Sequence, residues 1–165
     1  MKLAIVYFSA SGRTASMAEE IKAGIAQAGD VEVGIFPIAD VTKDSEAAAF
    51  IQEAKAVIVG TPDYYAAEAW QLKQWLDTCP VNLAGKLGGA YATANFPQGG
   101  ADVAIQSVLT QLLTKGMLLY SSGTGCGLPF IHLGPICLKD QEDASKELFQ
   151  VYGKRFAEKA LELFA

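Results

Sequence analysis

The stretch LAIVYF-SASGRT, residues 3–14, decides the fold, because an apolar run breaks there into a hydroxyl-rich turn and then into a helical pattern. A buried strand that feeds such a turn forms an anion site, since the first N–H groups of the following helix are unpaired and its dipole is positive there. Ser9, Ser11 and Thr14 can donate hydrogen bonds to phosphate oxygens, and Gly12 lets the backbone come close. The sequence therefore predicts a phosphate-binding turn. The simpler alternative is that Ser9 or Ser11 only caps the helix.

The composition favours one domain over residues 1–165. With 51% hydrophobic and 19% charged residues, the chain suits one core and leaves little room for a second. The N-terminal apolar run is too short for a signal peptide or a membrane span, so we expect a cytoplasmic protein without a membrane partner. The net charge of −5 disfavours nucleic acid as a partner. Cys79, Cys126 and Cys137 form no CxxC, so we expect no disulfide framework and no metal site. We expect each cysteine to be a small buried side chain, and a reactive thiol is the alternative.

Short apolar runs alternate with amphipathic patterns along the rest of the chain. We expect strands over 3–8, 31–38, 56–60, 87–93 and 117–121, and helices over 13–28, 44–54, 68–79, 100–115 and 141–164. Such units predict an α/β fold, a three-layer α/β/α sandwich around a five-stranded parallel sheet. If the strand order is 2-1-3-4-5, ligands bind beyond the carboxyl ends of the first, third and fourth strands, where the order reverses.

The loops after the third and fourth predicted strands suit a flat ligand. They are Thr61-Pro62-Asp63-Tyr64-Tyr65-Ala66 and Thr93-Ala94-Asn95-Phe96-Pro97-Gln98-Gly99-Gly100. Both combine aromatic rings with polar side chains, and a heteroaromatic ligand needs stacking on its faces and hydrogen bonds at its edges. The alternatives stay open: either tyrosine can simply cover the core edge, and Asn and Gln beside Pro and Gly can be turn formers.

These segments resemble the flavodoxin-like FMN-binding family over essentially the whole chain. Residues 9–14 are similar to the family's T/S-x-T/S-G-x-T phosphate loop. Residues 59–62 and 71–77 resemble the GTP…K-x-F-x-D stretch of NAD(P)H:quinone oxidoreductases of the Trp-repressor-binding-protein type. Residues 93–100, followed by a helix that ends in Lys115-Gly116-Met117, are similar to the third flavin loop of that group.

The resemblance implies bound FMN and a set of residues for each part of it. The phosphate would be held by Ser9, Ala10, Ser11, Gly12, Arg13 and Thr14. The isoalloxazine ring would be bordered on one side by Pro62, Asp63, Tyr64 and Tyr65, and on the other by Thr93, Ala94, Asn95, Phe96, Gln98 and Gly99. Ala10 and Ala94 would contribute mostly backbone groups.

His132, the only histidine, lies in the Gly- and Pro-rich segment 128–135. Long connections of this kind are often functional loops. A neutral imidazole there could donate a proton or a hydrogen bond to a quinone or flavin oxygen, so His132 is our candidate catalytic residue. A structural or exposed histidine is the alternative, and the loop could equally be a subunit contact.

Two features favour two-electron chemistry. In electron-transfer flavodoxins, which the chain also resembles, a glycine in the second flavin loop lets a peptide flip and hydrogen-bond the half-reduced ring, but residues 61–67 contain no glycine. Ala and Tyr take the required positive φ reluctantly. In addition, the charge of −5 gives only a modest field for steering a basic partner. We therefore expect an FMN-dependent NAD(P)H oxidoreductase that passes two electrons by hydride transfer to a quinone-like acceptor.

The sequence leaves alternatives open for the function and the oligomeric state. One is a flavodoxin-type carrier that docks to a redox protein, and another is a regulatory domain without FMN. A homodimer is open as well, since the oxidoreductases that the chain resembles are often oligomeric. No GxGxxG follows a strand, so no dedicated dinucleotide fold is encoded. The nicotinamide of NADH or NADPH, the expected reductant, could still stack directly over the flavin, and the sequence does not distinguish the two.

Overall fold

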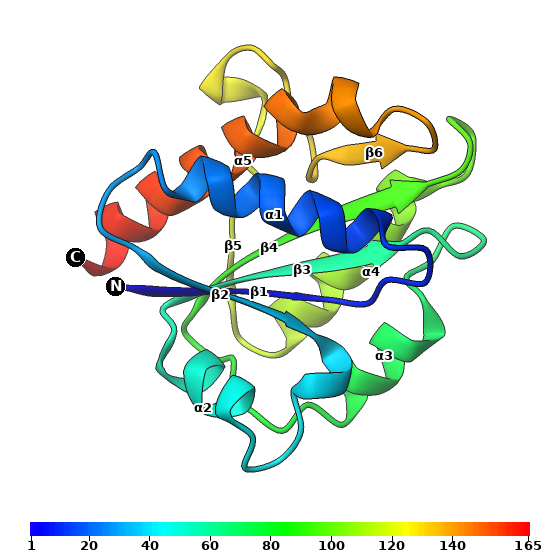
Figure 1. Cartoon of the computed structure of the whole chain (residues 1–165). Coiled ribbons are helices and arrows are strands. Elements are labelled where there is room, and N and C mark those ends of the chain that lie inside the picture. Colours follow the sequence, from blue (N-terminus) through cyan, green and yellow to red (C-terminus); the bar gives the residue numbers. More distant parts are fainter.

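The computed structural model describes residues 1–165 and places a parallel sheet between two layers of helices (Figure 1). The strands are β1 (Lys2–Tyr7), β2 (Glu32–Pro37), β3 (Ala56–Pro62), β4 (Leu87–Ala94), β5 (Leu118–Leu119) and β6 (Ile136–Leu138). The order β2-β1-β3-β4-β5 confirms the predicted flavodoxin-like arrangement. The apolar residues of β1, β3 and β4 are buried because helices cover both faces of the sheet.

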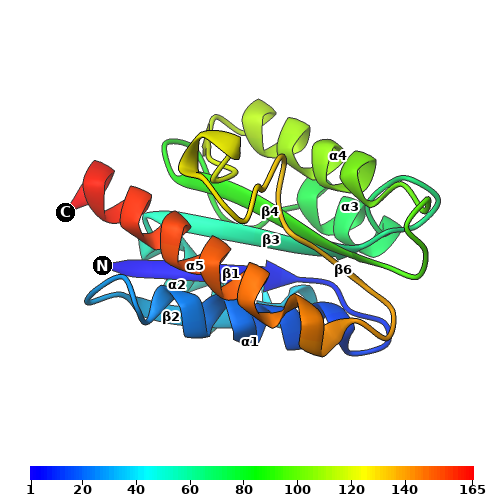
Figure 2. The ribbon, with the colours of Figure 1, turned by 90° about the horizontal axis from the view of Figure 1, so that it is seen from above.

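Figure 2 shows how the helices divide between the two faces of the sheet. The helices are α1 (Arg13–Ile25), α2 (Glu46–Glu53), α3 (Trp70–Asp77), α4 (Ala101–Thr114) and α5 (Glu142–Phe164), with short 3-10 turns η1 (Ile38–Asp40) and η2 (Thr124–Cys126). Helices α1 and α5 pack on one face around Tyr91 and Phe149. Helices α2, α3 and α4 pack on the other around Trp75 and Leu112. The sheet thus has a separate apolar core on each side.

The fifth strand differs from the prediction. Only Leu118 and Leu119 of the expected strand 117–121 pair with β4, and the unpredicted β6 pairs further along the same edge of β4. The two pieces together fill the place of one strand, and Tyr120–Pro135 runs outside the sheet between them. Three apolar residues after Gly134-Pro135 are too short a run to be recognised as a strand from periodicity.

The expected burial of all three cysteines is wrong for one of them. Cys137 is buried and Cys79 partly buried, but Cys126 is exposed in η2. None of the helices combines the length and the apolar character needed to cross a membrane.

The carboxyl ends of β1, β3 and β4 lie at one end of the sheet, on the right in Figure 1, and both chain termini lie at the other end. Parallel strands bring their following loops together at one edge. The three segments singled out from the sequence therefore meet there, beside the end of β6.

Candidate functional site

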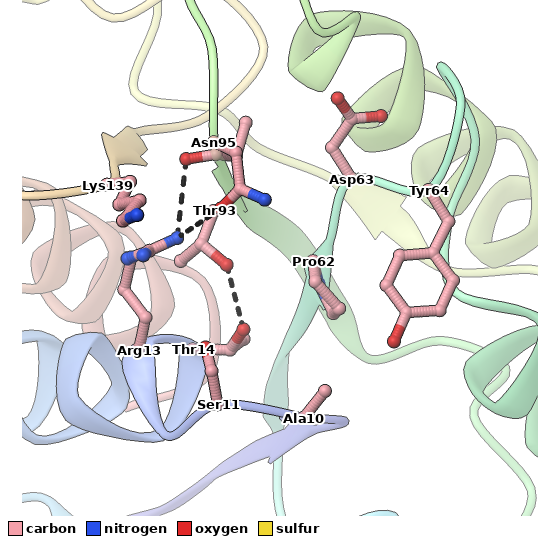
Figure 3. A pocket seen from close by; sticks show the side chains of 11 residues that line it. Ala10, Ser11, Arg13, Thr14, Pro62, Asp63, Tyr64, Thr93, Asn95 and Lys139 are labelled. Atoms are coloured by element: carbon pink, nitrogen blue, oxygen red, sulfur yellow. Dashed lines mark hydrogen bonds between the residues drawn. The ribbon is translucent and has the colours of Figure 1, made fainter.

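A cleft of about 340 Å³ opens at the carboxyl ends of these strands (Figure 3). Ten of the predicted site residues line it: Ala10, Ser11, Arg13, Thr14, Pro62, Asp63, Tyr64, Thr93, Ala94 and Asn95. They come from all three predicted loops. Lys139, which directly follows β6, completes the lining and was not predicted.

The turn after β1 leaves the start of α1 open to a ligand. Gly12 precedes the helix with a left-handed φ of 92° and makes no side-chain capping bond. Ser9 Oγ accepts hydrogen bonds from the N–H groups of Gly12, at 3.1 Å, and Ala15, at 3.4 Å. The capping alternative therefore describes Ser9, whereas the exposed Ser11 lines the cleft. The combination of an open helix start and a free hydroxyl suits an anion.

Thr14 ties the start of α1 to the end of β4. Its Oγ1 lies 2.9 Å from Thr93 Oγ1, and both residues are buried. The hydroxyl of Tyr91 donates to the carbonyl oxygen of Thr14 at 2.9 Å. The hydroxyl of Thr14 is turned toward β4 and already has a partner there. Thr14 therefore fixes the position of the turn and does not offer a free donor to the cleft.

Arg13 joins three segments around the cleft. Its Nε donates to Glu142 Oε1 at 2.7 Å, and its NH1 donates to the carbonyl oxygen of Ala94, at 3.4 Å, and to Asn95 Oδ1, at 3.3 Å. The hydrogen bond from Arg13 lowers the pKa of the Glu142 carboxyl. Arg13 thus holds the turn, the loop after β4 and the start of α5 together, as Figure 3 shows in part.

The segment after β3 is a tight hairpin. The N–H of Tyr64 donates to the carbonyl of Ala67 at 2.9 Å, and the N–H of Ala67 donates back to the carbonyl of Tyr64 at 3.2 Å. The two residues between them, Tyr65 and Ala66, have φ of 54° and 62°. This is the conformation of a two-residue type I′ turn, which normally carries Asn and Gly. Tyr65 and Ala66 therefore both take positive φ here, although such residues adopt it reluctantly.

A side chain secures this turn. Asp63 Oδ1 accepts a hydrogen bond from the N–H of Ala66 at 2.9 Å, and that N–H belongs to the peptide between Tyr65 and Ala66. Partial burial raises the pKa of the Asp63 carboxyl, although the same N–H acts to lower it. The peptide orientation is thereby held by a side chain at the edge of the cleft.

The loop after β4 packs against the hairpin. A Cβ atom added at Gly99 would lie 2.6 Å from Asp63 Oδ2, and one added at Gly100 would lie 2.4 Å from the Cβ of Ala66. Gly100 also has a φ of 97°. Glycine is therefore required at Gly100 both by the backbone conformation and by the close approach of the hairpin.

Several predicted residues do not line the cleft: Ser9, Gly12, Tyr65, Phe96, Gln98 and Gly99. Tyr65 projects fully into solvent from the turn, and Phe96 is 68% exposed. The structure also does not support His132 as a catalytic residue of this cleft. The side chain of His132 is exposed outside the lining, while its neighbour Ile131 is buried in the core beneath α1 and α5.

Lys139 was missed because β6 was missed. One signal could have found it: a basic residue directly follows the short apolar run Ile136-Cys137-Leu138, which pairs with the end of β4. It adds a cation to the cleft next to Arg13 (Figure 3).

Known proteins resemble this chain in sequence and in structure. The sequence model of the NADPH-dependent FMN reductase family matches residues 1–124. A flavodoxin of Clostridium saccharobutylicum is 38% identical over 99% of this chain and 100% of its own length. An NAD(P)H dehydrogenase (quinone) of Chromohalobacter salexigens is 25% identical over 76% of this chain and 73% of its own.

A solved structure described as a flavodoxin, WrbA-like protein from Agrobacterium tumefaciens superimposes with a TM-score of 0.80. It covers 98% of both chains at 22% sequence identity, a level at which the likeness concerns the fold. The family match covers β1, β3, β4 and the three loops that form the cleft. The chain therefore belongs to the flavodoxin-like NADPH-dependent FMN reductase family, in agreement with the motifs of its sequence.

Proposed function

We propose that the cleft binds FMN, with the phosphate at the start of α1 and the ring between the hairpin and the loop after β4. The donors suit this ligand, because the glycine-led start of α1, the hydroxyl of Ser11 and the ammonium group of Lys139 would face a phosphate, and Tyr64 and Asn95 border the place of the ring. The volume of about 340 Å³ lies in the range of small-molecule sites. FMN would supply the redox chemistry, and the protein would position it.

We further propose that the protein is an NAD(P)H-dependent oxidoreductase that passes two electrons to a quinone-like acceptor. The observation that carries this proposal is the hydrogen bond from Ala66 N–H to Asp63 Oδ1. A flip of the Tyr65–Ala66 peptide would break this bond and convert the turn to type II′, which requires glycine at its first central position. With Tyr65 there, the peptide carbonyl is not free to turn toward the flavin, so the site lacks this stabilisation for one-electron reduction.

The test is anaerobic reduction of the FMN-loaded protein, followed by absorbance. We expect rapid bleaching by NADH or NADPH, little one-electron-reduced flavin with dithionite, and reoxidation by benzoquinone. A protein that retains no FMN would contradict both proposals. Comparison of the rates with NADH and NADPH would identify the reductant.

A flavodoxin-type carrier that docks to a redox protein is the second candidate. It is favoured by the 38% identity to the Clostridium saccharobutylicum flavodoxin over the whole of both chains. The exposed rings of Tyr65 and Phe96 beside the cleft would suit contact with a protein surface. A strong one-electron-reduced band without any reaction with nicotinamide would establish this candidate.

A further inference from the structure

A second cleft, of about 550 Å³, lies between the η1–α2 connection and α3. It adjoins the first cleft through one pair of aromatic rings. Phe8 lines the second cleft and packs edge to face against Tyr64, with 6.4 Å between the ring centroids, and Tyr64 lines the first. A ligand long enough to pass this pair would occupy both clefts.

One of the residues that line the second cleft has a polar atom without a hydrogen-bond partner. This residue is Gln71, and its buried Oε1 accepts no hydrogen bond from the protein. Leaving a buried acceptor unpaired costs free energy, and such atoms are uncommon in folded proteins. A ligand with an N–H or O–H group at this point would satisfy Gln71.

The walls of the cleft suit a flat ring. Trp70 lines it yet is 64% exposed, so one face of its ring is available for stacking. Trp75 forms the floor and is fixed in place, because its Nε1–H donates to the carbonyl of Val41 at 3.2 Å. Such walls favour an aromatic or heteroaromatic ligand over an aliphatic one.

The rim of the cleft carries a positive charge. Lys43 lines it and takes part in none of the ion pairs of the protein. Thr42 adds a hydroxyl beside it. The ligand that fits all these features has a planar ring, a hydrogen-bond donor on that ring and an anionic group.

We propose that the second cleft binds the adenosine half of the nicotinamide dinucleotide. The exocyclic amine of adenine donates to Gln71 Oε1, the ring stacks on Trp70, and a phosphate group faces Lys43. The nicotinamide end then passes Phe8 and Tyr64 to reach the first cleft. This inference rests on the proposed function, and it explains how a chain without a GxGxxG motif would hold the far end of its reductant.

The first test is calorimetric titration of the FMN-loaded protein with AMP. We expect AMP to bind, and Gln71→Leu and Trp70→Ala each to weaken its binding roughly tenfold, since a buried hydrogen bond and a base stack are lost. Gln106→Leu, a change at an exposed glutamine of α4, is the matched control and should leave AMP binding unaltered. Absence of AMP binding, or equal binding by all four proteins, would overturn the proposal.

The second test separates the two ends of the reductant. Gln71→Leu should raise the KM for NAD(P)H roughly tenfold, with little change in kcat and none in the KM for reduced nicotinamide mononucleotide, which lacks the adenosine half. An equal rise in KM for both reductants would contradict the assignment of the cleft. If Gln71→Leu weakens the binding of hydroquinone but not that of AMP, the second cleft binds the electron acceptor instead. If neither NADH, NADPH nor reduced nicotinamide mononucleotide reduces the flavin, the proposed function is refuted. The AMP titration would still test whether the second cleft binds adenosine.

Discussion

Two turns at the same end of the sheet place residues in left-handed backbone, and they do so by different means. In the turn after β1, the left-handed position is Gly12, and nothing lies within 4 Å of a Cβ atom added there. In the hairpin after β3, Tyr65 and Ala66 take the left-handed conformation although neither is glycine. The first turn is open to a ligand, and the second is closed by its own hydrogen bonds.

The difference shows what glycine marks in this protein. At Gly12 the absence of a side chain keeps the backbone accessible to the phosphate that we propose to bind there. In the hairpin the reciprocal bonds between Tyr64 and Ala67, together with Asp63, impose a conformation that costs about 1–2 kcal/mol per residue. Absence of glycine from a loop therefore does not exclude positive φ when neighbouring groups hold the backbone.

The largest effect is expected where the loop after β4 supports the hairpin. Gly100→Ala combines an unfavourable φ with a clash against Ala66 and should lower the free energy of unfolding by roughly 2–4 kcal/mol. Gly85→Ala has a similar positive φ but open space, so it should cost only about 1–2 kcal/mol. Urea denaturation measures the free energy of unfolding of both variants. Equal losses would show that the contact between Gly100 and the hairpin does not contribute to stability.

The next effect concerns the open turn. Gly12→Ala should raise the Kd for FMN roughly five- to thirtyfold, because the strain of about 1–2 kcal/mol falls on the backbone proposed to bind the phosphate. Gly125→Ala, at an equally open glycine without a positive φ, should leave the Kd unchanged. Titration of FMN fluorescence gives both constants. An unaltered Kd for Gly12→Ala would place the phosphate elsewhere.

A smaller effect is expected from releasing the hairpin. Tyr65→Gly allows the Tyr65–Ala66 peptide to flip without strain, so the one-electron-reduced flavin seen during dithionite titration should increase roughly fivefold, which corresponds to about 1 kcal/mol. Tyr65→Phe keeps the backbone restriction and is the matched control. Similar spectra for the two variants would show that the backbone restriction at Tyr65 does not control one-electron reduction of the flavin.

The smallest effect is a pH dependence of stability that comes from the ion pair between Arg13 and Glu142. The pKa of Glu142 is lowered by Arg13, so the ion pair stabilises the fold above the ordinary pKa of 4.5, and this contribution is lost as the pH falls through the lower value in the folded protein. The difference in urea midpoint between wild type and Glu142→Gln should therefore be present at pH 7 and vanish in acid. Glu147→Gln, at an exposed position of α5, should show no such trend.

The sheet order and most of the cleft could be predicted from local patterns. The apolar runs and the turn at residues 9–14 place β1, β3 and β4 and therefore the loops that follow them, and ten predicted residues line the cleft. These features are readable because each depends on consecutive residues and on the rule that parallel strands end at one edge.

The rest depends on contacts between distant segments. The hydroxyl of Thr14 turns to Thr93, and Arg13 reaches Glu142, because folding brings α1 beside β4 and α5. The left-handed turn at Tyr65 likewise depends on the Asp63 carboxylate. Lys139 reaches the cleft only through β6, a strand too short to leave a periodic pattern.

The position of the termini has a practical consequence. Both lie at the end of the sheet opposite the cleft (Figure 1). If the protein is attached to an electrode through either terminus, the edge of the sheet proposed to bind the flavin faces the solution. The length of the sheet then separates that edge from the electrode surface. Soluble acceptors would then reach the flavin freely, while direct electron exchange with the surface would be slow.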